Sequence, residues 1–232
     1  MRASLEPSYI LHSRPYSESS ALLEVFARNH GRVGLVARGA RGSRSRWKGV
    51  LQPFRPMVLS WTQRGELGTL TGADQVASPP ALGGDTLFCG LYANELLMRF
   101  MQRSDPHPGL FDHYRDMLGA LASGTPPQPV LRVFEYRLLA AAGFGLQLEH
   151  EHGSDRALRA DRWYLYEPDA GPLPCDPATG QKRQLVSGEA LLALKSGEVG
   201  ENHLKELKAL MRKLIRYYLG DKPIRSQQLF TR

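Results

Sequence analysis

Apolar and polar residues alternate through the first third of the chain, a period of two that is typical of half-buried strands. Short β-prone segments lie at residues 9–11, 22–27, 33–37, 57–61 and 67–71, separated by turn-forming residues. Five such strands with one long loop after the third predict a small closed barrel, for which the OB-fold is the leading candidate. A six-stranded SH3-like barrel would give a similar pattern, so the sequence alone does not decide between the two.

Beyond Pro79-Pro80 and Gly83-Gly84 the apolar period changes to about 3.6 residues, which is typical of amphipathic helices. Apolar stripes predict helices over residues 87–100, 110–121, 130–142, 187–194 and 202–218. Residues 146–183 break this rhythm with Gly, Pro and Asp and are interpreted as a small irregular insert. The predicted fold class is therefore α+β: an OB-fold barrel over 1–80, then a mainly helical domain over 81–232 that carries the insert.

The cysteine content and the apolar segments indicate the cellular location of the protein. The two cysteines, Cys89 and Cys175, lie far apart and suggest no disulfide framework, which fits a reducing cytosol. The most apolar segment, residues 87–101, contains Asn94, Glu95 and Arg99 and cannot be a membrane span. We expect a cytoplasmic protein without membrane contact.

Charge is distributed unevenly along the chain. Residues 1–80 hold 11 Lys and Arg against 5 Asp and Glu, so they contribute +6 of the net +7. No acidic residue occurs between Glu24 and Glu66, a span with nine cations. A field so one-sided favours a polyanionic partner, and nucleic acid is the first candidate.

The loop after the third predicted strand concentrates this charge. Residues 38–48 contain four arginines and a lysine among glycines and serines that let the backbone approach a phosphate closely. The cations predicted to bind DNA are Arg28, Arg32, Arg38, Arg41, Arg44, Arg46 and Lys48. Trp47, Phe54 and Trp61 could stack on bases or belong to the barrel core, and the sequence leaves both open.

Residues that could support catalysis or hold a metal do not form a recognisable set. The tract Glu149-His150-Glu151-His152 with Cys175 contains zinc ligand types, but a structural site requires four ligands in paired spacing and only one thiol is available. Nucleophile–base arrangements and glycine-rich phosphate loops are missing as well. The sequence favours a binding protein, with no metal and no other cofactor. An RNA-binding OB protein and a metal-assisted nuclease that uses 149–152 remain the alternatives.

An ordered series of short motifs resembles the RecO family of bacterial recombination and repair mediators over essentially the whole chain. The motifs occupy residues 10–20, 31–33, 37–41, 51–54, 91–97, 110–111, 132–139, 143–145 and 220–226. Each motif is weak by itself, but the ordered set is specific.

The resemblance implies an N-terminal OB-fold, a helical C-terminal domain, binding to single- and double-stranded DNA, and annealing of complementary strands. It also implies help in loading recombinase onto DNA coated by single-strand-binding protein, together with the partner RecR. Many members carry a four-cysteine zinc site in the insert, and this chain departs from it by retaining only Cys175. An acidic protein tail would need a pocket edged by cations, and the helix around Arg132, Phe134 and Arg137 offers such residues.

Overall fold

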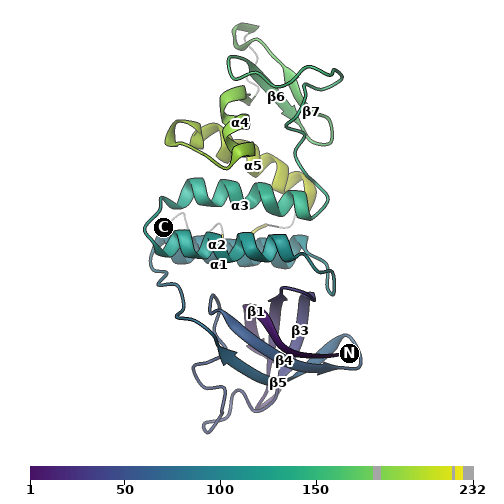
Figure 1. The fold of residues 1–232 in the computed structure, drawn as a ribbon, viewed down its shortest axis with the longest axis vertical. Coiled ribbons are helices and arrows are strands. Elements are labelled where there is room, and N and C mark those ends of the chain that lie inside the picture. The colour runs from purple at the N-terminus through teal and green to yellow at the C-terminus, as the bar shows by residue number, and fades with distance from the viewer. Residues whose placement is uncertain (180–183, 221–222, 227–232) are drawn as a thin grey trace. The chain divides into compact units, whose positions relative to one another are not determined.

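The computed structural model describes residues 1–179, 184–220 and 223–226, and the fold is drawn in Figure 1. The chain forms two compact units, Met1–Ser123 with the C-terminal segment from Ile224, and Gly124–Pro223. Within the described residues no helix is long and apolar enough to cross a membrane.

Five strands form a closed barrel in the order β1-β2-β3-β5-β4, which confirms the predicted OB-type barrel (Figure 1). The strands are β1 (Arg2–Pro15), β2 (Ala21–Ala27), β3 (Gly31–Ala37), β4 (Met57–Gln63) and β5 (Leu67–Gln75). The barrel closes where β3 and β5 pair in parallel, Gly34–Val36 against Leu67–Thr69, while all its other neighbours are antiparallel.

Strand β1 is much longer than the three residues that its sequence pattern predicts. Its first part pairs with β4 and its second part with β2, with a register shift between Ala3 and Glu6 and another between Ile10 and His12. Such bulges bend a strand and increase its twist, which lets one strand reach two neighbours and close the barrel. The second register shift falls at Leu11, within the predicted segment, and residues 8–11 are all buried. The sequence therefore shows this apolar run but not the full length of the strand.

The barrel interior is packed with alternating residues from every strand. The buried cluster includes Ile10, Leu23, Leu35, Leu59 and Trp61, each with no measurable exposure. This dense apolar filling holds the strands in register.

Helices α1 (Asp85–Phe100) and α2 (Pro108–Ala122) belong to the same unit as the barrel. A buried polar network links them to it: the Asn94 side chain donates to the carbonyl oxygen of Leu11 at 2.9 Å and accepts from the Tyr114 hydroxyl at 2.5 Å. Burial raises the pKa of Tyr114 well above its ordinary value, so this hydroxyl stays a donor.

The described C-terminal segment returns to α1 of this unit. The Glu95 carboxylate accepts hydrogen bonds from the Arg225 backbone at 3.0 Å and from the Ser226 backbone and hydroxyl at 2.8 Å each, besides pairing with Arg99. Partial burial alone would raise the pKa of Glu95, but these hydrogen bonds outweigh it and lower that pKa. Of the closing motif at 220–226, residues 221–222 lie outside the described residues.

The second unit consists of α3 (Pro127–Ala141), α4 (Gly188–Ser196), η2 (Glu201–His203) and α5 (Leu204–Leu219) with a small sheet in the order β7-β6-β8. Its strands are β6 (Trp163–Glu167), β7 (Gly171–Pro174) and β8 (Leu185–Ser187), with η1 (Pro177–Thr179) between the last two. Ser187, the first residue of the predicted helix 187–194, caps α4 by accepting a hydrogen bond from the Ala190 backbone N–H at 3.2 Å. Residues 180–183 of the predicted insert lie outside the described residues.

Candidate nucleic-acid interface

The basic loop between β3 and β4 is fixed to the barrel by the side chain of Trp47. This ring is only 7% exposed and belongs to the barrel core, and its indole N–H donates to the Arg38 carbonyl oxygen at 3.3 Å. The Arg46 guanidinium lies 4.1 Å from the centre of the same ring and donates to the Thr71 carbonyl oxygen at 3.3 Å. The loop therefore presents its cations from a defined platform.

Several of the predicted cations are exposed and have no internal counter-charge. Within the part of the chain that the structure describes, the side chains of Arg38, Arg44 and Lys48 make no hydrogen bond or ion pair. The same holds for Arg64 in the β4–β5 turn and for Arg2 at the start of β1. Unpaired surface cations can exchange their counterions for phosphates, which is the main source of affinity for nucleic acid.

Arg41 is exposed but already engaged in holding the β1–β2 turn. Its guanidinium donates to the Ser17 carbonyl oxygen at 2.7 Å, and its backbone N–H donates to the Ser19 carbonyl oxygen at 2.9 Å. The basic loop and this turn are thus joined into one surface.

Arg28 and Arg32, also predicted to bind DNA, make contacts inside their own unit. Arg28 pairs with Asp112 of α2 at 2.9 Å, and this hydrogen-bonded pair raises the pKa of the arginine and lowers that of the carboxyl. The half-buried Arg32 donates to the Met98 carbonyl oxygen of α1, and desolvation lowers its pKa. Both join the barrel to the helices, and we leave them out of the candidate interface.

The aromatic residues considered for base stacking are all in the interior. Trp47, Phe54 and Trp61 are 7%, 8% and 0% exposed, so the alternative that these rings stack on bases is wrong. Trp47 and Trp61 belong to the barrel core, as the other alternative had it, whereas Phe54 is buried against α1 at Gly90. The exposed aromatic of the barrel is Tyr16, with 55% of its surface accessible. Tyr16 is not among the aromatic residues predicted to stack on bases, although an aromatic residue among the serines of a polar turn is itself a signal.

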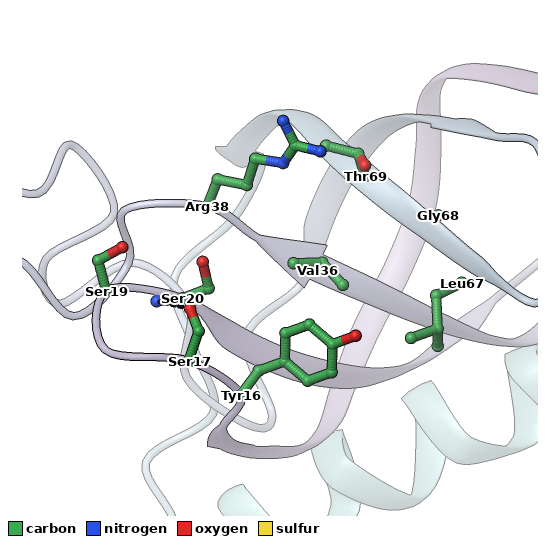
Figure 2. A pocket seen from close by; sticks show the side chains of 9 residues that line it. All are labelled: Tyr16, Ser17, Ser19, Ser20, Val36, Arg38, Leu67, Gly68 and Thr69. Atoms are coloured by element: carbon green, nitrogen blue, oxygen red, sulfur yellow. Dashed lines mark hydrogen bonds between the residues drawn. The ribbon is translucent and has the colours of Figure 1, made fainter.

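Two adjoining hollows lie on the barrel beside these residues. The first, of about 380 Å³, is bordered by the β1–β2 turn, the end of β3 and the start of β5 (Figure 2). The second, of about 690 Å³, shares Arg38, Leu67 and Thr69 with the first and continues to Arg64 and Arg2. The shared residues make the two hollows one groove with cations along it, which we call the barrel groove.

Two of the three predicted partner-binding residues are buried. Arg132 and Phe134 of α3 are 5% and 2% exposed, and the Arg132 guanidinium pairs with the buried Glu135 carboxylate at 2.8 Å. Arg137 is partly exposed, and its guanidinium lies 5.3 Å from the centre of the Tyr136 ring. The structure thus places one of the three within reach of a partner.

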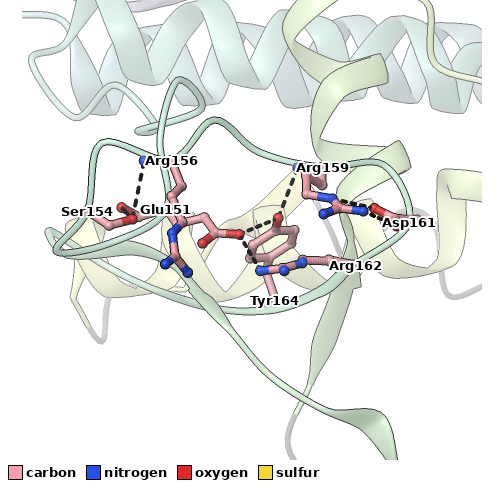
Figure 3. A network of polar contacts seen from close by, with 7 residues as sticks. All are labelled: Glu151, Ser154, Arg156, Arg159, Asp161, Arg162 and Tyr164. Atoms are coloured by element: carbon pink, nitrogen blue, oxygen red, sulfur yellow. Dashed lines mark hydrogen bonds and ion pairs between the residues drawn. The ribbon is translucent and has the colours of Figure 1, made fainter.

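The acidic and histidine residues of the insert make separate structural contacts. Glu151, 4% exposed, accepts from the Tyr164 hydroxyl at 3.1 Å and from Arg162 at 3.2 Å (Figure 3). Glu149 pairs with Lys195 at 2.6 Å, and this hydrogen bond lowers its pKa. Across the described ranges, no three His, Cys, Asp or Glu side chains gather closely enough to hold a metal ion.

We therefore keep the prediction that the purified protein carries no stoichiometric zinc. Cys175 is the insert's lone thiol. The carboxylates of Glu149 and Glu151 already have basic or hydroxyl partners. Elemental analysis should find well under one zinc per chain, and a chelator should leave the circular dichroism spectrum unchanged. About one tightly bound zinc per chain, with loss of structure on its removal, would contradict this expectation.

Comparison with known proteins connects this architecture to one family. The family models "Recombination protein O N terminal" and "Recombination protein O C terminal" match residues 1–79 and 83–228. A DNA repair protein RecO of Nitrosococcus oceani is 46% identical over 99% of this chain and 93% of its own length. Those of Methylococcus capsulatus and Coxiella burnetii are 44% and 42% identical, over 99% and 98% of this chain and 93% and 98% of their own. With a closed basic barrel followed by helices, and with matches along nearly its full length, the chain belongs to the RecO family of DNA repair proteins.

Proposed function

We propose that this protein is a DNA-binding recombination mediator that anneals complementary strands and helps to load recombinase onto DNA coated by single-strand-binding protein. RecR and single-strand-binding protein are its proposed protein partners, and single- and double-stranded DNA are its ligands. In this proposal the protein acts in the cytoplasm at the nucleoid. It makes and breaks no covalent bond, so it is not an enzyme.

The observation that carries the proposal is the set of unpaired cations along the basic loop and the barrel groove. Arg38, Arg44, Lys48 and Arg64 face solvent without a carboxylate partner in the described structure, whereas Arg28 shares its charge with Asp112. Phosphate contacts carry no sequence information, so binding through these cations suits a factor that must act on any damaged DNA.

Annealing follows from the same charges. Two complementary strands repel each other through their phosphates, and a surface that neutralises part of this charge lets them approach closely enough for base pairing to begin. The barrel contributes most of the chain's net positive charge, so we assign this step to the barrel.

For the tail of single-strand-binding protein we propose the second unit. Arg137 is the partly exposed cation of the predicted set, whereas Arg132 is buried and paired with Glu135. A tail carboxylate could accept a charge-assisted hydrogen bond from the Arg137 side chain.

Strand annealing in the presence of single-strand-binding protein tests the proposal. Wild-type protein should speed the pairing of two coated complementary oligonucleotides, as followed by fluorescence energy transfer. The variant Arg44→Gln, Lys48→Gln, Arg64→Gln should be at least about tenfold slower, because three phosphate contacts are lost.

Matched RNA oligonucleotides provide the comparison for the RNA-binding alternative. Equal or faster pairing of RNA would favour that alternative, and a wild-type protein that leaves the DNA annealing rate unchanged would contradict the proposed function. Incubation of the same oligonucleotides with divalent cations should leave them intact, whereas cleavage would favour the nuclease.

A further inference from the structure

We infer that the hollow between Tyr16 and Arg38 is a subsite for one unpaired nucleotide, which lets the barrel distinguish single-stranded DNA from duplex. The inference rests on the proposed DNA binding and adds to it the kind of strand that this part of the groove accepts.

The shape and lining of the hollow fit a nucleotide. Its volume of about 380 Å³ lies in the range of small-ligand sites. Val36 and Leu67 supply an apolar floor where β3 and β5 pair, and in Figure 2 Tyr16 and Arg38 extend on either side of Val36. The hollow therefore offers an apolar surface, an aromatic ring and a cation within one site.

Each of these groups matches one part of a nucleotide. The Tyr16 ring, which is more than half exposed, can stack on a base, because every base has a π-face. The Arg38 guanidinium, without an internal counter-charge in the described structure, can pair with the phosphate. Hydroxyls of Ser17, Ser19 and Thr69 line the same hollow and can donate to or accept from base edges.

The turn that carries Tyr16 is held in place before any ligand arrives. Tyr16 N–H donates to the Ser20 carbonyl oxygen at 3.0 Å, and the Ser20 N–H donates to the Ser17 hydroxyl at 3.2 Å. Arg41 ties the turn to the basic loop from outside through the Ser17 carbonyl oxygen. Arg41 is thus a positioning residue for the subsite, and the ordered turn reduces the entropy that binding would otherwise cost.

Selectivity for single strands follows from base pairing. In a duplex each base is stacked and paired, so it could enter the hollow only after being turned out of the helix, which costs binding free energy. A duplex can still bind the cations of the loop and groove through its phosphates. Loss of the Tyr16 ring should consequently weaken the single-strand complex and spare the duplex complex.

The test compares Tyr16→Ala with wild type on an oligothymidylate and on a duplex of the same length, by fluorescence anisotropy. Affinity for the single strand should fall about tenfold, while duplex affinity should change by less than about twofold. Tyr16→Phe keeps the ring and should bind like wild type. Tyr217→Ala removes a similarly exposed tyrosine from the other unit and should have no effect.

A second readout detects stacking directly. Fluorescence of 2-aminopurine within a single-stranded oligonucleotide should be quenched by wild-type protein and by Tyr16→Phe, but much less by Tyr16→Ala. Equal losses on both DNA forms, or unchanged quenching in Tyr16→Ala, would overturn the subsite while leaving the proposed function standing. If wild-type protein bound neither form, the proposed function itself would fail.

Discussion

Replacing Gly31 with alanine is expected to destabilise the protein by about 3 to 5 kcal/mol. Gly31 begins β3 with φ +66°, and a Cβ there would lie 1.9 Å from the carbonyl oxygen and 2.4 Å from the carbonyl carbon of Asp105. Both are backbone atoms, so no side chain can rotate to make room. The backbone pairing beside it, from the Ser104 N–H to the Arg32 carbonyl oxygen at 2.9 Å, would have to be disrupted.

Gly39→Ala is the matched control. Gly39 has nearly the same backbone conformation, with φ +71°, but a Cβ there would meet nothing within 4 Å. It should cost only the strain of the left-handed conformation, about 1 to 2 kcal/mol. Urea denaturation of both variants measures the difference, and equal losses of stability would contradict the close approach at Asp105.

The same experiment bears on the domain organisation. The apolar period changes beyond Pro79-Pro80, and from this the sequence predicts a boundary near residue 80. The compact units of the structure, in contrast, group α1 and α2 with the barrel and change over after Ser123. Helices α1 and α2 are joined to the barrel by close contacts such as that at Gly31 and by the Arg28–Asp112 pair. We expect the barrel to unfold together with α1 and α2. In urea denaturation of Gly31→Ala, the helix and strand signals of circular dichroism should therefore be lost with the same midpoint.

Removal of three exposed cations should cause the largest loss of DNA affinity. In Arg44→Gln, Lys48→Gln, Arg64→Gln, affinity for a single-stranded oligonucleotide in about 0.1 M salt should fall roughly 100-fold. None of the three side chains has a partner within the described ranges, so the fold should be retained. Circular dichroism and an unchanged unfolding midpoint would verify this.

A second triple variant separates local contacts from net charge. Arg115→Gln, Arg156→Gln, Arg159→Gln also removes three positive charges, but from exposed positions outside the barrel. Its DNA affinity should fall by less than about threefold, because none of these three cations belongs to the basic loop or the barrel groove that is proposed to contact phosphates. Similar losses in both variants would mean that net charge alone governs binding.

Much of the fold follows from local pattern. Alternation is visible in β4 and the start of β5, which bury one face, and β2 and β3 are visible as short apolar runs because they are buried on both faces. Ser187 marks the start of α4 because its side chain caps that helix. Strand β1 was underpredicted because its bulges shift the alternation between the two faces.

The candidate site was harder to predict because it depends on partners distant in sequence. The positive charges of Arg28 and Arg32 are evident from the sequence, but their hydrogen-bond partners are not. Asp112, which binds Arg28, lies 84 residues away, and Met98, which binds Arg32, lies 66 residues away. Likewise, nothing in the local sequence tells whether Trp47 in a basic loop faces DNA or the barrel core. Tyr16 gains significance only when β3 and β5 are brought beside its turn.

Salt dependence of DNA binding tests the central claim, that the cations of the basic loop and the barrel groove contact phosphates. The dissociation constant for a single-stranded oligonucleotide should be measured by anisotropy from about 0.05 to 0.3 M salt for wild type and both triple variants. Each lost phosphate contact should flatten the slope of log K against log salt by roughly 0.7, so Arg44→Gln, Lys48→Gln, Arg64→Gln should lower it by about 2. The control triple variant should keep the wild-type slope. An unchanged slope in a folded Arg44→Gln, Lys48→Gln, Arg64→Gln variant would contradict the account, because the three cations of the wild type would then not contact phosphate.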